Sequence, residues 1–128
     1  MIRYRILEDK GIVVVEPVSA LSAEDFQALG ESVDQYLEQH LVIQGLLIHA
    51  RSFPGWESLA GLTSHIKFVR GHHKKIRRVA LVTDTALGSL AQALAKHFVS
   101  AEIRHFPYSE LREAMEWLEN SPGSPSTS

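Results

Sequence analysis

The residue types that could do chemistry gather in one stretch of the chain, from Phe53 to Arg78. The stretch opens with a Pro-Gly turn and Trp56, and it closes with cations that no acidic residue interrupts between Glu57 and Asp84. We call the following residues the basic block: Lys67, Arg70, His72, His73, Lys74, Lys75, Arg77 and Arg78. An aromatic residue at one end and cations at the other make a candidate binding site, but not by themselves a catalyst.

The chain contains 7 histidines, but their spacing does not favour a metal site or a catalytic base. On one helix, Ser58 and His65 would lie two turns apart, roughly 10 Å at a rise of ~1.5 Å per residue, whereas a nucleophile and its base need about 2.6–3.2 Å. His65 and His72 are separated by the same two turns. Glu57 and Arg51 could form an acid–base pair, although Glu in a first helical turn also complements the macrodipole. We therefore predict no catalytic residue, no metal and no cofactor.

The basic block has two interpretations. Lys67 and Arg70 would lie in the last turn of a helix, where cations complement its negative end, and Lys74 and Lys75 would then belong to a solvated loop. On the other hand, the block holds six of the 13 Lys and Arg residues. Such a density of charge beside apolar surface attracts anionic lipid at ~1 kcal/mol per residue close to a membrane. Both interpretations stay open at this point.

A second set of candidates follows the ends of apolar strands, which is where ligands bind in open α/β sheets. Phe53 and Trp56 come after one such strand, although packing in the core is the commoner fate of aromatic residues. Backbone amides at a helix start supply an anion site, and Arg51 lies beside it in the sequence. We predict a ligand-binding site that consists of Pro17, Arg51, Phe53, Trp56, Glu57, Ser58, Leu59 and Asp84.

Composition limits the class of protein. A chain of 128 residues is long enough for one domain with its own core, and a net charge of -2 argues against a nucleic-acid partner. The absence of cysteine excludes disulfides and thiol chemistry. No apolar run approaches the ~18 residues of a membrane span, and the charged N-terminus does not resemble a signal peptide. We expect a cytoplasmic protein, with peripheral attachment to the inner membrane surface as a further expectation.

Apolar periodicity predicts alternating strands and helices. Residues 2–7 alternate as a half-buried strand does, and a turn at Gly11 joins them to an apolar strand over residues 12–15. Ser22 and Asp25 form a capping-box pattern that starts a helix. Further along, we expect these elements: a strand within residues 42–50, a helix over 53–70 with Gly71 as its C-cap, a strand over 78–83, a helix carrying Leu87, Leu90, Leu94 and Phe98, an edge strand over 102–106, and a helix capped by Ser109.

Strands that alternate with single helices imply mostly parallel pairing. We therefore predict an α/β fold with a mostly parallel five-stranded sheet, to which the first hairpin adds one antiparallel edge strand. A single domain would occupy residues 1–119. Residues 120–128 are rich in Ser, Pro and Gly and have no apolar anchor, so we expect a disordered tail there.

Several stretches resemble the SpoIIAA-like family, which groups with the STAS and CRAL-TRIO type α/β domains. They are GIVVVEP, LSAEDFQAL, GLLIHARSFPGWESLAGL, HIKFVRGHHKKIRRVALVTD, and FVSAEIRHF with AMEWLE. The resemblance runs from Gly11 to about Glu119, and its specificity lies in the combination of GW with HH and RRVALVTD. It implies a (βα) superhelix with helices stacked on one side, and a small non-enzymatic module with ligand or membrane association. Helices on one side would leave the other apolar face uncovered, so we also expect a homodimer.

In the sporulation relatives, a serine at the start of the helix after the third strand is phosphorylated by a partner kinase that is also an anti-sigma factor. The pattern of those relatives there is Asp-Ser-Ser-Gly. This chain has Trp56, Glu57, Ser58 and Leu59 in that place, so the Asp-Ser pair is missing. We therefore predict that Ser58 is not a regulatory phosphosite.

These features together predict a non-enzymatic module that binds an amphipathic or anionic small molecule or lipid, with association at an anionic membrane surface. The alternative is a protein-interaction module of the anti-sigma-factor-antagonist type, which would use the same helix as its partner surface without serine phosphorylation.

Overall fold

The chain opens with a β-hairpin. In the computed structural model, β1 (Ile2–Leu7) pairs antiparallel with β2 (Ile12–Pro17). The turn between them contains Gly11 at φ +70°, a left-handed conformation that glycine adopts without steric cost. The predicted hairpin is therefore confirmed. The structure describes residues 1–52, 54–84 and 101–120.

Helix α1 (Ala23–Leu37) begins at the predicted capping box. The Asp25 amide donates to Oγ of Ser22 over 3.2 Å, and the Ser22 amide donates to the Asp25 carboxylate over 2.9 Å. Two amides at the helix start are thus satisfied by side chains. The three later strands follow in chain order: β3 (Ile43–His49), β4 (Ile76–Val82) and β5 (Glu102–Phe106).

Helix α2 (Leu59–His72) begins later than the sequence predicts, with Ser58 as its N-cap. The cause is a tertiary contact, because Trp56 forms a parallel bridge with Leu21 that keeps the backbone before Ser58 extended. The predicted C-cap is also wrong. Gly71 lies inside α2, and the chain continues in right-handed conformation through a short 3-10 helix, η1 (His73–Lys75).

Helix α4 (Leu111–Glu119) ends the described part of the chain. Its N-cap is Glu110 rather than the predicted Ser109. The amide of Glu110 donates to the carbonyl of Pro107 over 2.9 Å, so a turn precedes the helix and moves its start by one residue. The helix expected around residues 87–98 and nearly all of the expected tail lie outside the described residues.

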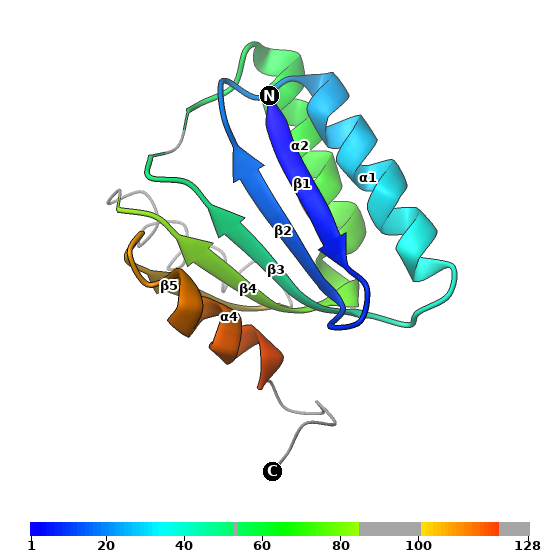
Figure 1. Cartoon of the computed structure of the whole chain (residues 1–128). Coiled ribbons are helices and arrows are strands. Elements are labelled where there is room, and N and C mark those ends of the chain that lie inside the picture. Colours follow the sequence, from blue (N-terminus) through cyan, green and yellow to red (C-terminus); the bar gives the residue numbers. More distant parts are fainter. Residues whose placement is uncertain (53, 85–100, 121–128) are drawn as a thin grey trace.

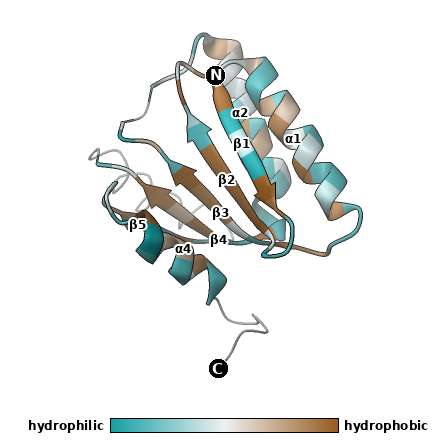
Figure 2. Cartoon of the chain, in the orientation of Figure 1, coloured by the Kyte–Doolittle hydropathy of each residue, from teal (hydrophilic) through white to brown (hydrophobic). Residues whose placement is uncertain are grey.

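The strands lie side by side in the order β1-β2-β3-β4-β5 (Figure 1). The pairs β2–β3, β3–β4 and β4–β5 are parallel, and only β1–β2 is antiparallel. The predicted fold class is therefore confirmed: an α/β domain on a mostly parallel five-stranded sheet with one antiparallel edge strand. Figure 2 shows the apolar character of the inner strands, and along β1 that character is broken by polar residues.

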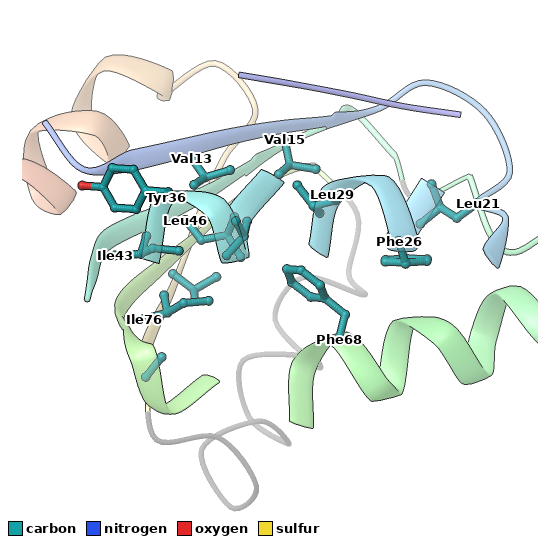
Figure 3. Packing of buried hydrophobic residues seen from close by; sticks show 13 residues of the cluster. Val13, Val15, Leu21, Phe26, Leu29, Tyr36, Ile43, Leu46, Phe68 and Ile76 are labelled. Atoms are coloured by element: carbon teal, nitrogen blue, oxygen red, sulfur yellow. The ribbon is translucent and has the colours of Figure 1, made fainter. Parts of the chain in front are cut away.

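One face of the sheet is covered by α1 and α2, which lie next to each other (Figure 1). Val13 and Val15 of β2 belong to the buried cluster on this face, together with Leu29 of α1. Phe26 of α1 and Phe68 of α2 lie between the helices with ring centroids 6.4 Å apart (Figure 3). This contact joins the two helices above the sheet.

Helix α4 covers the opposite face of the sheet (Figure 1). Ile12 and Val14, which alternate with the residues of the first face, pack in one cluster with Ala114 and Leu118 of α4. Gly45 of β3 permits this approach, because an added Cβ would lie 2.8 Å from Cδ2 of Leu118. The expectation that all helices stack on one side is therefore wrong for α4.

This arrangement removes the argument for a homodimer. A second copy is expected from the sequence because one apolar face would be uncovered. In the structure, Leu47 of β3 and Ala80 of β4 lie in the cluster that α4 covers, and both are fully buried. The homodimer stays a prediction, now without that support.

Candidate functional site

The structure brings two predicted ligand-binding residues together at the carboxyl ends of the parallel strands. Nη1 of Arg51 lies 3.8 Å from Oδ2 of Asp84, and the guanidinium lies 4.7 Å from the ring centroid of Tyr108. Asp84 also accepts a hydrogen bond of 2.9 Å from the Tyr108 amide. A cation, a carboxylate and an aromatic ring thus meet at the sheet edge where α/β proteins bind ligands.

Tyr108 is not among the residues predicted from the sequence, although a regular signal marks it. Each of the three residues comes two positions after the end of a strand: Arg51 after β3, Asp84 after β4 and Tyr108 after β5. Those strand ends are in register, because His49 pairs with Val82 and Val82 pairs with Phe106. Residues at matching positions after neighbouring parallel strands are therefore brought to one place.

His49, the last residue of β3, also belongs to this group. Its ring stacks on Tyr108 with centroids 4.5 Å apart and an interplanar angle of 7°. Its Nδ1 lies 3.7 Å from the carboxylate of Glu16. Pro17 is the last residue of β2, next to Glu16 at the same edge. We call Glu16, His49, Arg51, Asp84 and Tyr108 the carboxyl-edge group.

The other predicted ligand residues lie around the start of α2. The indole Nε1–H of Trp56 donates to Nδ1 of His65 over 3.2 Å. Oγ of Ser58 accepts a bond of 3.3 Å from the Gly61 amide, so this hydroxyl caps the helix. The Glu57 amide donates to the carbonyl of Leu21 over 2.8 Å. The predicted pair of Glu57 with Arg51 is not formed, since the carboxylate beside Arg51 belongs to Asp84. Phe53 lies outside the described residues.

Arg78, a member of the basic block, has partners within the protein. Arg78 is only 13% exposed, and it donates to Oε1 of Glu102 over 3.0 Å and to the carbonyl of Trp117 over 2.7 Å. Its guanidinium also lies 4.5 Å from the centroid of the Trp117 ring. Arg78 thus holds β4, β5 and α4 together. These contacts turn it toward the protein, so its contact with a membrane or an anion stays a prediction without support from the structure.

His72 also faces the protein rather than the solvent. One ring nitrogen lies 2.8 Å from Oδ1 of Asp34 on α1, and the other lies 2.8 Å from the carbonyl of Phe68. Both neighbours offer acceptor oxygens to the ring. His72 therefore links α2 to α1, and its role as a membrane or anion contact stays a prediction without support from the structure.

The outer face of α2 combines apolar and cationic side chains. Leu59 is 77% exposed and Ile66 is 50% exposed, and seven residues of separation place them about two turns apart on one face. Lys67 and Arg70 are exposed on the same helix. The residues of α2 that are buried are Gly61 and Phe68. We call Leu59, Ile66, Lys67, Arg70, Lys74 and Lys75 the α2 surface.

Two kinds of site are not found within residues 1–52, 54–84 and 101–120. No three histidine or acidic side chains gather there closely enough to hold a metal ion. Among the helices of the same ranges, none combines the length and the apolar character that a bilayer crossing requires.

Comparison with known proteins places the fold in a family. The chain is similar to a crystal structure of an uncharacterized protein with a SpoIIAA-like fold from Shewanella loihica PV-4, at 24% identity, with a TM-score of 0.72 and 92% of each chain covered. No curated protein matches the chain. The family model described as SpoIIAA-like matches residues 12–119. The chain therefore belongs to the SpoIIAA-like family.

Proposed function

We propose that this protein binds anionic membrane surfaces peripherally through the α2 surface. The observation that carries the proposal is the exposure of Leu59 (77%) and Ile66 (50%) on a helix that also presents Lys67 and Arg70. Large apolar side chains in water are unfavourable unless something covers them. Cations beside these side chains favour a binding partner that has both negative charge and an apolar interior. The interface of an anionic bilayer has both.

The expected strength is weak and reversible. Lys67, Arg70, Lys74 and Lys75 are exposed, and four cations at ~1 kcal/mol each give roughly 4 kcal/mol at an anionic surface. Salt screens this attraction over ~8 Å at physiological ionic strength. Partial burial of Leu59 would add a part of the ~1.5–3 kcal/mol that full burial of such a side chain is worth.

The test is co-flotation with phosphatidylserine vesicles and with phosphatidylcholine vesicles. We expect binding to the anionic vesicles that falls as salt rises, and a loss of binding in the double variant Lys74→Glu, Lys75→Glu. The matched control is Arg3→Glu, Arg5→Glu, which changes the same charge on the exposed side of β1 and should bind as the parent does. Equal binding to both vesicle types would refute the proposal.

A protein partner on the same helix is the second candidate. Membership of the SpoIIAA-like family favours it at the level of the module type, and Leu59 and Ile66 at a spacing of two turns are also suited to an apolar groove in a partner. Changing both residues to Ser would weaken either mode of binding. The charge reversal separates them, because a groove that recognises the apolar side chains would tolerate Lys74→Glu and Lys75→Glu better than a vesicle does.

A further inference from the structure

An open groove of about 360 Å³ lies between β1 and α1. Its volume falls within the ~300–1,000 Å³ of small-molecule sites. Tyr4, Ile6 and Glu8 line it from the β1 side, and none of the sequence-predicted site residues takes part. The helix side consists of Ser32, Gln35, Tyr36, Gln39 and His40. Most of these side chains carry groups that can donate or accept hydrogen bonds, so the groove is suited to a polar ligand.

Tyr36 gives the first indication of which chemical group the ligand carries. The residue is only 8% exposed, and within the described part of the chain its hydroxyl has no hydrogen-bond partner. Figure 3 shows this hydroxyl at the end of a ring that points away from the packed cluster. Burial, and then the charge of Glu8, raise the pKa of Tyr36. The hydroxyl therefore stays protonated and is available as a donor.

Glu8 is the acidic residue that lines the groove. The cations near it in the sequence do not face the groove. Nζ of Lys10 lies 3.4 Å from a carboxylate oxygen of Glu119. Arg3 and Arg5 alternate with Tyr4 along β1, so their side chains lie on the other side of the strand. Glu8 forms no ion pair within the described residues. A carboxylate without a cation favours a positively charged ligand.

Three further side chains of the groove, those of Tyr4, Ser32 and His40, are held in place around these two groups. The hydroxyls of Tyr4 and Ser32 lie 2.6 Å apart, so one bond already fixes them across the groove. The ring of His40 stacks on Tyr36 with centroids 4.0 Å apart, and its Nδ1 lies 3.0 Å from the Tyr36 carbonyl. The groove is therefore preorganised, which reduces the entropic cost of binding.

We propose that this groove binds a small hydroxylated ammonium compound, such as an amino sugar or an amino alcohol. The ammonium group donates to the Glu8 carboxylate, and a ligand hydroxyl accepts from the Tyr36 O–H. Other ligand hydroxyls exchange hydrogen bonds with the amides of Gln35 and Gln39. An anionic ligand is disfavoured by Glu8, and a fully apolar ligand would leave the Tyr36 hydroxyl unpaired. The site is separate from the α2 surface, so neither proposal depends on the other.

The test is a titration of the full chain with glucosamine and with glucose, followed by backbone amide NMR and calorimetry. Glucosamine should bind at least about fivefold more tightly, because only it carries the ammonium group. In Glu8→Gln this preference should disappear. In Tyr36→Phe the affinity for both sugars should fall by about threefold to tenfold, which is the range of one hydrogen bond.

The control is Lys74→Glu, Lys75→Glu, which alters the α2 surface and should leave sugar binding unchanged. Gln39→Ala provides a second variant in the groove, since this exposed residue lies beyond the end of α1 and its loss should leave the fold intact. Equal affinity for the two sugars would overturn the ammonium assignment. Absence of saturable binding at millimolar concentrations, or shifts at the amides of α2 instead of β1 and α1, would overturn the site itself.

Discussion

The indole Nε1–H of Trp56 donates a hydrogen bond of 3.2 Å to Nδ1 of His65. This nitrogen therefore carries no proton in the folded protein, and the neutral imidazole holds its proton on Nε2. The ring of His65 stacks on Phe26 with centroids 4.7 Å apart, and burial lowers the pKa of His65. Trp56 is also bridged to Leu21. His65 thus connects the start of α2 to α1.

We predict that stability falls as the pH is lowered from about 7.5 to 5.5, in part because of His65. Its pKa is depressed in the folded state, so the unfolded chain takes up a proton first, near the ordinary value of about 6.5. Between the two pKa values the unfolded state binds more protons, and stability therefore decreases with falling pH. The measurement is the urea midpoint as a function of pH.

The comparison variant is His65→Asn, whose side-chain oxygen still accepts from Trp56 but does not titrate. It should lose less stability than the parent over the same pH range. The emission of the tryptophans should also change with acid in the parent more than in the variant, because protonation of Nδ1 removes the acceptor of Trp56. Identical pH profiles for the two proteins would show that His65 is not responsible.

Gly61 and Gly71 give a matched pair of substitutions within α2. A Cβ added at Gly61 would lie 2.5 Å from the carbonyl oxygen of Leu21, whereas one added at Gly71 meets nothing within 4 Å. Gly61→Ala must move the Leu21 segment and should destabilise the protein by about 1–3 kcal/mol. Gly71→Ala should stabilise it by about 0.4–1 kcal/mol, because it reduces the entropy of the unfolded chain. Chemical denaturation measures both, and equal effects would contradict the packing of α2 on Leu21.

Arg78 and Lys67 are both cations of the basic block, yet we predict opposite effects when they are neutralised. Arg78→Gln should cost about 1.5–3 kcal/mol of stability, because a charged donor to Trp117 and Glu102 is lost. The Arg78→Gln variant should bind vesicles as the parent does. Lys67→Gln should change stability by less than about 0.5 kcal/mol and weaken vesicle binding about fivefold, which corresponds to ~1 kcal/mol.

The strands were predictable from the sequence because each depends on local periodicity. The edge strand expected over residues 102–106 coincides with β5 (Glu102–Phe106). The capping box of Ser22 and Asp25 is equally local and is confirmed. The start of α2 was not predictable in this way, because a bridge between Leu21 and Trp56 decides it. Apolar residues on both faces of a strand show that both are covered, but not which helix covers each.

The candidate site was predictable only in part for the same reason. Arg51 and Asp84 come together because each follows a strand end, which the sequence reveals. Their contact with Tyr108 depends on the register of β3, β4 and β5, which only pairing fixes. The direction of the Arg78 side chain depends on the position of α4. Side chains whose partners lie in distant segments are therefore the ones whose contacts the sequence alone did not predict.

Tyr36 and Tyr4 provide the last prediction, which concerns the groove between β1 and α1. The hydroxyl of Tyr4 lies 2.6 Å from that of Ser32, while the hydroxyl of Tyr36 has no hydrogen-bond partner within the described residues. Tyr4→Phe removes a hydrogen bond and should cost about 0.5–1.5 kcal/mol. Tyr36→Phe removes a hydroxyl that has no partner within the described residues and that is not a buried unsatisfied group, so it should leave stability nearly unchanged.

Urea denaturation of the two variants measures this difference, and Ser32→Ala is the control for the Tyr4 bond. The double variant Tyr4→Phe, Ser32→Ala should cost less than the sum of the single changes, because both remove the same bond. A loss of more than about 1 kcal/mol in Tyr36→Phe would mean that its hydroxyl already has a partner in the folded protein. The O–H would then not be available to a ligand, and the groove would lose the donor on which its proposed selectivity for hydroxylated compounds depends.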